Sequence, residues 1–385
     1  MKARDQRNEG KSTCRFQGHA NPRRIATAMT KQESPGLSEA VPYADITVLI
    51  HGPILRESTP GSPRGMTHEV VQSVRHVLPG AKIVISTWDG SGAEDFGAEM
   101  VVYSSDPGGS PYAPGARLNN VNRQIVAMRA GLERIDTRWA LKLRSDTKLV
   151  SAGMATLWPR YQARNPGYGV FERRIVTSAI LTYNARLCIG SRLFTPFLFH
   201  VNDMIQFGLT SDLRRLWYIP TMPLSDFEFF SKEELEGQVD KISNRRVPED
   251  YIWTCALKAA GFTTNDSWMD ISPGLLAVSE LSIVNNFQLL DHAEMGFHCL
   301  KYPNFDQDFP IDMPFFTHRG WLSCYQLYCD PLVVVPVREP ITLRSLRRRL
   351  QKGLNPARVI QYLKRRTRPF RFRIKEMARR IILWK

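Results

Sequence analysis

The sequence lacks the features that mark membrane-spanning, secreted or zinc-structured proteins. No apolar run approaches the ~18 to 20 residues that a spanning helix needs. The basic residues near the start are not followed by an apolar stretch, so no signal peptide is predicted. The six cysteines show no C-x-x-C or zinc-ligand spacing, and we interpret them as free thiols, mostly in the core. These absences predict a cytoplasmic protein.

Most of the chain also lacks an excess of charge of either sign. The net charge is +15, yet 35 of the 52 basic and 35 of the 37 acidic residues lie before Arg338. The remaining 17 Lys and Arg, with two Glu, fall in residues 338–385, where Leu, Ile, Phe and Trp384 are interspersed. That composition is typical of an amphipathic helix on an anionic membrane surface. RNA or a protein partner is the alternative for this tail, but a neutral body argues against a nucleic-acid-binding protein.

The pattern along the chain predicts an α/β fold. Residues 1–42 are polar and without periodicity, and we predict that they are disordered. Strands are predicted at 46–50, 82–88 and 100–103, with a helix over 67–78 that is capped by Thr67. This alternation predicts a mostly parallel central sheet covered by helices in a single domain, 43–330. A strand pair is predicted over 170–183 and a helix over 248–260, before a linker and basic tail, 331–385.

The most informative stretch runs from Asn119 to Lys148. An amphipathic helix is followed by a charged strand in which Lys142, Arg144 and Asp146 alternate with apolar residues. Side chains alternate along a strand, so these three should share one face. Two cations and a carboxylate at a strand end suit a phosphorylated ligand, and Asp146 could hold it through Mg²⁺ or Mn²⁺. The alternatives are an exposed strand face and an Asp that only makes a turn.

Polar residues at neighbouring chain turns are further candidates for the same ligand site. Helix starts bind anions through unpaired N–H groups, although such residues also serve as ordinary caps. Acids at strand ends could bind a ribose or a base, and a glycine permits close ligand approach, although plain turn chemistry explains both. The candidates are Asn120, Asn122 and Arg123 at the helix start, and His51, Gly52, Trp88 and Asp106 at strand ends.

Two acids in the second half of the chain are candidates for a general base. Asp203 lies in a polar segment, and Glu249 lies at the start of the predicted helix over 248–260. A carboxylate in either place could take the proton of a hydroxyl group, which is a poor nucleophile when neutral. For Glu249 the alternative is an acid favoured only by the helix dipole. We take Glu249 as the first choice and Asp203 as the second.

Several blocks in this order resemble the WavE lipopolysaccharide-synthesis family of bacterial glycosyltransferases, over residues 45–330. They are His51–Pro53, Leu78–Trp88, Asp106–Gly108, Asn120–Gln124, Leu141–Asp146, Asp203 with Phe207–Gly208, and Asn286–Phe287 before Lys301–Tyr302. The resemblance implies a GT-A-like transferase that uses a nucleotide-sugar donor to build lipopolysaccharide or a related surface polysaccharide. Such transferases often carry Asp-x-Asp where this chain has Arg144-Ser145-Asp146.

The resemblance and the residues together give one hypothesis. Residues 43–150 should bind the nucleotide sugar, and 151–330 the glycolipid or oligosaccharide acceptor. The tail should hold the protein on the inner face of the bacterial inner membrane. A sugar-phosphate transferase with the same diphosphate site is the alternative within this fold.

Overall fold

The computed structural model describes residues 41–58, 62–112, 118–191, 194–236, 238, 240–302 and 314–336. All of them belong to the compact unit that begins at Ala40. The predicted disorder of residues 1–42 falls almost entirely outside the described residues, and the predicted basic tail, 338–385, lies wholly outside them. No helix in the described part of the chain is both long enough and apolar enough to cross a membrane.

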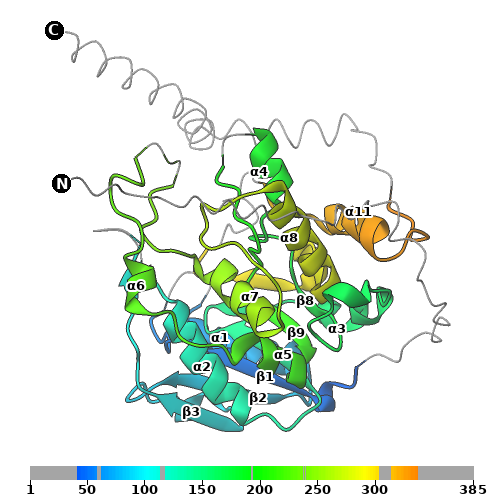
Figure 1. Cartoon of the computed structure of the whole chain (residues 1–385). Coiled ribbons are helices and arrows are strands. Elements are labelled where there is room, and N and C mark those ends of the chain that lie inside the picture. The colour runs from blue at the N-terminus through cyan, green and yellow to red at the C-terminus, as the bar shows by residue number, and fades with distance from the viewer. Residues whose placement is uncertain are drawn as a thin grey trace, which may run out of the picture. The chain divides into compact units, whose positions relative to one another are not determined.

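One seven-stranded sheet runs through the domain (Figure 1). Its strand order is β10-β8-β9-β6-β1-β2-β3, and β9 alone runs antiparallel to its neighbours β6 and β8. The strands are β1 Ile46–His51, β2 Lys82–Trp88, β3 Met100–Ser104, β6 Trp139–Arg144, β8 Ile175–Ser178, β9 Ile205–Leu209 and β10 Phe287–Leu290. The predicted α/β class with a mostly parallel sheet is therefore confirmed. Strands from both 43–150 and 151–330 build this one sheet.

Helices cover both faces of the sheet. The face seen toward the viewer in Figure 1 carries α2 Val121–Glu133, α5 Thr210–Trp217 and α7 Pro248–Ala259, which contact one another in series. The core on this side also includes residues of α8 Pro273–Asn286 and α11 His318–Tyr328. The opposite core includes residues of α1 Met66–Val77, α3 Gly153–Leu157 and α9 His292–Met295. The sheet therefore separates two apolar cores.

Shorter elements complete the connections. Two small antiparallel pairs join β7 Thr147–Leu149 to β11 Phe297–Cys299, and β4 Ser110–Pro111 to β5 Leu118–Asn119. Short α-helices occur at α4 Ala185–Ser191 and α6 Leu224–Phe227. Four 3₁₀ turns occur among the described residues, at Tyr43–Asp45, Glu94–Phe96, Trp158–Arg160 and Pro166–Tyr168. The pairing of β7 with β11 brings the chain after β6 beside a segment some 150 residues further on.

Two local predictions are wrong for identifiable physical reasons. The predicted strand pair over 170–183 contains only β8, because the backbone N–H groups of Glu172 and Arg173 bind the Asp212 carboxylate, each at 2.8 Å. Thr67 does not cap α1, whose N-cap residue is Gly65. The Thr67 hydroxyl instead accepts a hydrogen bond from Leu55 N at 2.9 Å and so fixes the loop before the helix.

Candidate active site

The end of β6 carries a tight ion pair. Arg144 Nη2 lies 2.5 Å from Asp146 Oδ2, and the Arg144 side chain is 31% exposed whereas that of Asp146 is 7% exposed. Burial lowers the Arg144 pKa, but the nearby Asp146 and Asp203 outweigh it, so the net pKa is raised. The guanidinium is therefore a permanent cation at the carboxyl end of parallel strands, where ligands of open α/β sheets bind.

Lys142 lies deeper on the same face of β6 and is completely buried. Its Nζ donates to the backbone oxygen of Asp203 and to Gln124 Oε1 at 3.3 Å, and lies 4.2 Å from the centre of the Trp217 ring. Burial lowers the Lys142 pKa to about 7, although Asp203 opposes the shift. The predicted direct contact of Lys142 with a diphosphate disagrees with this structure, because the ammonium group binds the protein interior.

Asp203 is held to the start of α2 as well as to β6. Its Oδ2 accepts a hydrogen bond from Gln124 Nε2 at 2.5 Å, and the same Gln124 accepts one from Lys142. These contacts join β6, α2 and the segment before β9 around one carboxylate. The three residues place a negative charge at a fixed position near Arg144, whose pKa Asp203 raises.

Glu249 stands at the first turn of α7, opposite His200. Glu249 Oε2 lies 3.7 Å from His200 Nε2, and the Glu249 side chain is 24% exposed. Burial lowers the His200 pKa to about 4 against the opposing effect of Asp203, so the imidazole is neutral near pH 7. Glu249 also raises the Lys142 pKa through its charge, as Asp203 does. The two predicted acids therefore act on the same buried cation.

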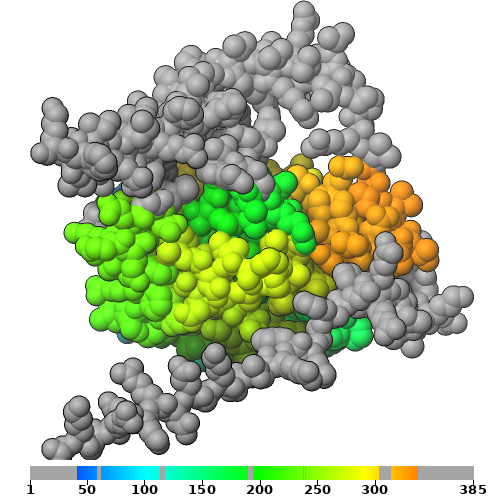
Figure 2. Space-filling model, turned by 45° about the horizontal axis from the view of Figure 1, so that its top comes forward, coloured from blue at the N-terminus to red at the C-terminus, as the bar shows by residue number. Residues whose placement is uncertain are grey.

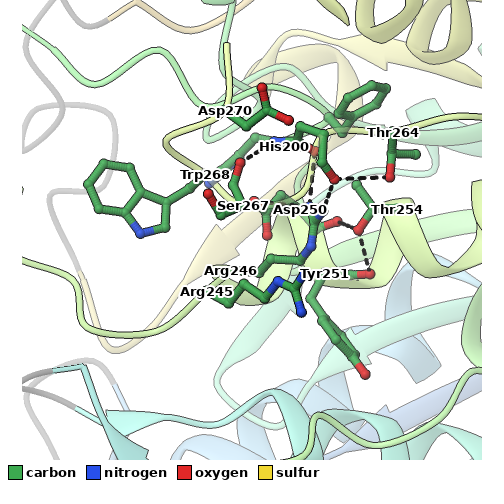
Figure 3. A network of polar contacts seen from close by, with 12 residues as sticks. His200, Arg245, Arg246, Asp250, Tyr251, Thr254, Thr264, Ser267, Trp268 and Asp270 are labelled. Carbon is green, nitrogen blue, oxygen red and sulfur yellow. Dashed lines mark hydrogen bonds and ion pairs between the residues drawn. The ribbon is translucent and has the colours of Figure 1, made fainter. Parts of the chain in front are cut away.

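A polar network fixes the start of α7 (Figure 3). Arg246 Nη1 donates to Asn265 Oδ1 at 3.0 Å and lies 3.8 Å from Asp250 Oδ2. Thr254 Oγ1 donates to the backbone oxygen of Asp250 at 2.7 Å. Burial raises the Asp250 pKa to about 7, although Arg246 opposes the rise. The network ties the first turn of α7, and with it Glu249, to the loop around Asn265.

His51 and Gly52 close the neighbouring strand end. His51 pairs with Arg144 in the β1–β6 register, and burial, then Lys142 and Arg144, lower its pKa well below the usual value. Gly52 has φ +117°, and a Cβ there would lie 3.1 Å from Ser145 Oγ. This residue is glycine because the chain turns there in a left-handed conformation close to β6. Trp88 ends β2 further along the sheet and is partly buried.

Asp106 and Arg123 form a second ion pair beside the start of α2. Arg123 Nε and Nη2 donate to the two carboxylate oxygens of Asp106, each at 2.7 Å, and this pairing lowers the Asp106 pKa. Arg123 Nη1 also donates to Asn120 Oδ1 at 3.0 Å. Asn120 is the N-cap residue of α2 but its side chain makes no cap bond, whereas Asn119 Oδ1 accepts from Val121 N. The ligand role of this group stays a prediction.

A family model decides the identity of the chain. The model described as WavE lipopolysaccharide synthesis matches residues 46–354, about four fifths of the sequence. The chain belongs to the WavE lipopolysaccharide-synthesis family. No curated protein sequence matches it. The resemblance stated from the sequence motifs is thereby confirmed.

Three solved structures are similar to this WavE protein at low sequence identity. A galactosyltransferase, LgtC, in complex with donor and acceptor sugar analogues is 11% identical, with TM-score 0.30, over 55% of this chain and 70% of that one. A 4-diphosphocytidyl-2C-methyl-D-erythritol synthase from Anaerococcus prevotii is 9% identical, with TM-score 0.30, over 61% and 95%. A cytidylyltransferase from Leptospira borgpetersenii is 11% identical, with TM-score 0.29, over 77% and 98%. Each of these three TM-scores is below 0.5.

Asn122 has a structural role in this WavE protein. Its Nδ2 donates to Met222 O at 3.0 Å and its Oδ1 accepts from Met222 N at 2.7 Å, so it clamps the chain after α5 to α2. We expect Asn122→Ala to lower the free energy of unfolding by about 1–3 kcal/mol, because two backbone groups lose their partner. Urea denaturation measures this loss, with Asn120→Ala as the control, since Asn120 is exposed and its side chain accepts a hydrogen bond from Arg123. Equal stability of the two variants would contradict the structural role.

Asp146, the predicted metal ligand, lies in no cluster of candidate ligands in the described part of the chain. Within the described ranges no three His, Cys, Asp or Glu side chains gather as metal ligands. Asp146 Oδ2 binds Arg144, and Asp146 Oδ1 accepts from Thr147 Oγ1 at 3.3 Å. Mg²⁺ and Mn²⁺ need several oxygen ligands, and a guanidinium on the one carboxylate competes with the ion. The metal role of Asp146 stays a prediction, and no step below uses a metal.

Proposed function

We propose that this WavE protein is a glycosyltransferase that moves a sugar from a nucleotide-sugar donor onto a lipopolysaccharide core or a related surface polysaccharide. The observation that carries the proposal is that Arg144, at the end of the central strand β6, and the carboxylates of Asp203 and Glu249 all act electrostatically on the buried Lys142. A permanent cation and two carboxylates provide both charges that the reaction needs. The family supports lipopolysaccharide synthesis, and the site supports the transfer chemistry.

Arg144 acts on the leaving group. The bond between the sugar carbon and the diphosphate oxygen breaks, and its electron pair leaves with the nucleoside diphosphate. Arg144 faces that developing charge, and Asp146 aims the guanidinium through the 2.5 Å contact while taking only part of its five N–H donors. Lys142 supports the site from below by holding Asp203 rather than by touching the donor. His51, Gly52, Trp88 and Asp106 would line the nucleotide side.

A carboxylate acts on the acceptor. The acceptor hydroxyl oxygen forms the new bond to the sugar carbon, and its proton passes to the base. Glu249 is the first choice for the general base, because its side chain is partly exposed. The Asp203 carboxylate, in contrast, is buried and accepts a hydrogen bond from Gln124. His200, whose Nε2 lies 3.7 Å from Glu249 Oε2, is neutral near pH 7 and so does not form a charged pair with that carboxylate. Asp203 then sets the electrostatic potential of the site.

The acceptor suggests where the enzyme works. Lipopolysaccharide precursors are glycolipids, so the enzyme must reach a membrane surface. The basic tail, 338–385, is proposed to hold the protein on the inner face of the bacterial inner membrane through anionic lipids.

One set of experiments tests both the binding of the nucleotide-sugar donor and the role of Glu249 as the general base. A thermal-shift screen of UDP-, GDP-, dTDP- and CMP-sugars, with and without Mn²⁺, should find at least one stabilising nucleotide sugar. With that donor we expect Glu249→Gln to lower kcat by about 10²–10⁴-fold, the usual contribution of a general base, while the donor Kd stays unchanged. Glu228→Gln, at an exposed position, is the matched control. Full activity of the Glu249 variant would move the role of base to Asp203, and the absence of any stabilising nucleotide sugar would refute the transferase proposal.

A further inference from the structure

The chain that follows α11 lies back along that helix instead of leaving the domain at once. Asp330 N donates to Tyr325 O at 2.9 Å, and Gln326 Nε2 donates to Val333 O at 2.8 Å. Arg319 Nε donates to Pro336 O at 2.7 Å. Hydrogen bonds from the first and the last turn of the helix therefore fix residues 330–336, which we call the C-terminal arm.

The arm carries apolar side chains on both of its faces. Val333 and Val335 pack against the core, as expected for alternate residues of an extended segment. Leu332 and Val334 point away from it and are 88% and 83% exposed, and Leu327 on α11 is 71% exposed. Figure 2 shows the orange stretch to which they belong on the surface of the molecule. One of these residues alone would be unremarkable in a folded protein, but three lie within eight residues of the chain, on α11 and on the arm that is bound to it. We call these three residues the apolar patch.

The size of this patch and the chain beside it indicate what covers it. Three aliphatic side chains offer roughly 200–350 Å², whereas a stable protein interface needs about 800 Å² from each partner. The segment that begins two residues after the arm carries 17 Lys and Arg against two Glu. A few inserted apolar side chains next to a basic segment match the interfacial region of an anionic bilayer, where each contribution adds to the other.

We propose that Leu327, Leu332 and Val334 insert into the headgroup region of an anionic membrane beside the basic tail. The tail provides attraction from a distance, and the arm provides a rigid apolar contact that fixes the orientation of the domain on the membrane. This inference rests on the membrane attachment proposed for the tail and is independent of the transferase chemistry.

High salt weakens the electrostatic part of the attachment, so that the apolar contribution of the arm can be compared between variants. Electrostatic attachment weakens as the Debye length falls from about 10 Å at 0.1 M salt to about 4 Å at 0.5 M, whereas apolar insertion does not. The experiment is flotation of the full chain with phosphatidylethanolamine–phosphatidylglycerol vesicles at both salt concentrations. The test variant carries Leu327→Ser, Leu332→Ser and Val334→Ser together. The matched control carries Leu118→Ser, Val150→Ser and Leu224→Ser, three exposed apolar residues elsewhere.

We expect the wild type and the control to keep most of their binding at 0.5 M salt, and the test variant to bind at least about tenfold more weakly there. At 0.1 M salt all three proteins should bind. Equal binding of the test variant and the wild type at 0.5 M would overturn the arm contact, and so would a wild type that binds only at low salt, which would leave the tail attachment standing. A change from dimer to monomer in the test variant, by light scattering and without loss of vesicle binding, would make the patch a self-interface and refute the proposal. Donor hydrolysis, measured without vesicles, tests the transferase separately.

Discussion

Replacing Asp146 with alanine is expected to lower sugar transfer by about 10²–10³-fold, the usual cost of losing one aimed charge or donor in an active site. The carboxylate holds Arg144 at 2.5 Å, and without it the guanidinium is no longer directed at the leaving diphosphate. The rate of nucleoside diphosphate release at saturating donor measures the effect. The rate of the Asp146→Asn variant should lie between those of the wild type and of Asp146→Ala, because asparagine keeps a hydrogen-bond acceptor but loses the charge.

The fold should survive this change. Removing one partner of a fully buried ion pair is severely destabilising, but the Arg144 side chain is 31% exposed and water can solvate it. Asp136→Ala is the control, since Asp136 is an exposed aspartate paired with Lys82 at 3.0 Å. We expect it to leave the rate unchanged. Wild-type turnover in the Asp146 variant would show that neither the ion pair nor a metal at Asp146 takes part in the reaction.

The first half of the fold could be predicted from the sequence because its signals are local. The strands β1, β2 and β3 and the helix α1 were predicted to within a few residues, and α2 was predicted as an amphipathic helix before β6, since each has its own apolar pattern and clear turn residues. β8, β9 and β10 have four or five residues each and are completed by pairing with distant strands. β9 lies antiparallel between β6 and β8, an arrangement that no local pattern indicates.

In the candidate site, too, local features could be predicted from the sequence and contacts between distant residues could not. Alternation along β6 correctly predicted that Lys142 and Arg144 share a face, opposite Leu141 and Leu143. The alternation could not predict how deeply each side chain is buried. Lys142 is covered by Trp217, which belongs to α5, some 75 residues later in the chain. No sequence pattern selects His200, which lies beside Glu249 only through tertiary packing. Sequence patterns therefore predict the face of a charged residue but not what covers it.

Lys142 is expected to lower the stability of the folded protein while it supports sugar transfer. Replacing it with methionine should raise the free energy of unfolding at pH 7 while lowering kcat at least tenfold. Burial brings its pKa from 10.5 to about 7, which corresponds to roughly 5 kcal/mol against the charged form at 1.36 kcal/mol per pKa unit. Losing the contacts with Asp203, Gln124 and Trp217 offsets part of this, so we expect a net gain of about 2–3 kcal/mol. Activity should fall because the Asp203 segment loses its anchor on β6.

The pH dependence identifies the cause of that gain. Between pH 7 and 10.5 the unfolded chain keeps the Lys142 proton while the folded protein has lost it, so wild-type stability due to this group rises with pH. Lys142→Met removes that rise, and the stability difference between variant and wild type should shrink steadily from pH 7 to pH 10. Lys82→Met, which removes an exposed lysine 3.0 Å from Asp136, should show no such change. Chemical denaturation across this range measures all three proteins. The prediction is contradicted if Lys142→Met is less stable than the wild type at pH 7 and if its free energy of unfolding depends on pH as that of the wild type does. The buried ammonium group would then stabilise the fold.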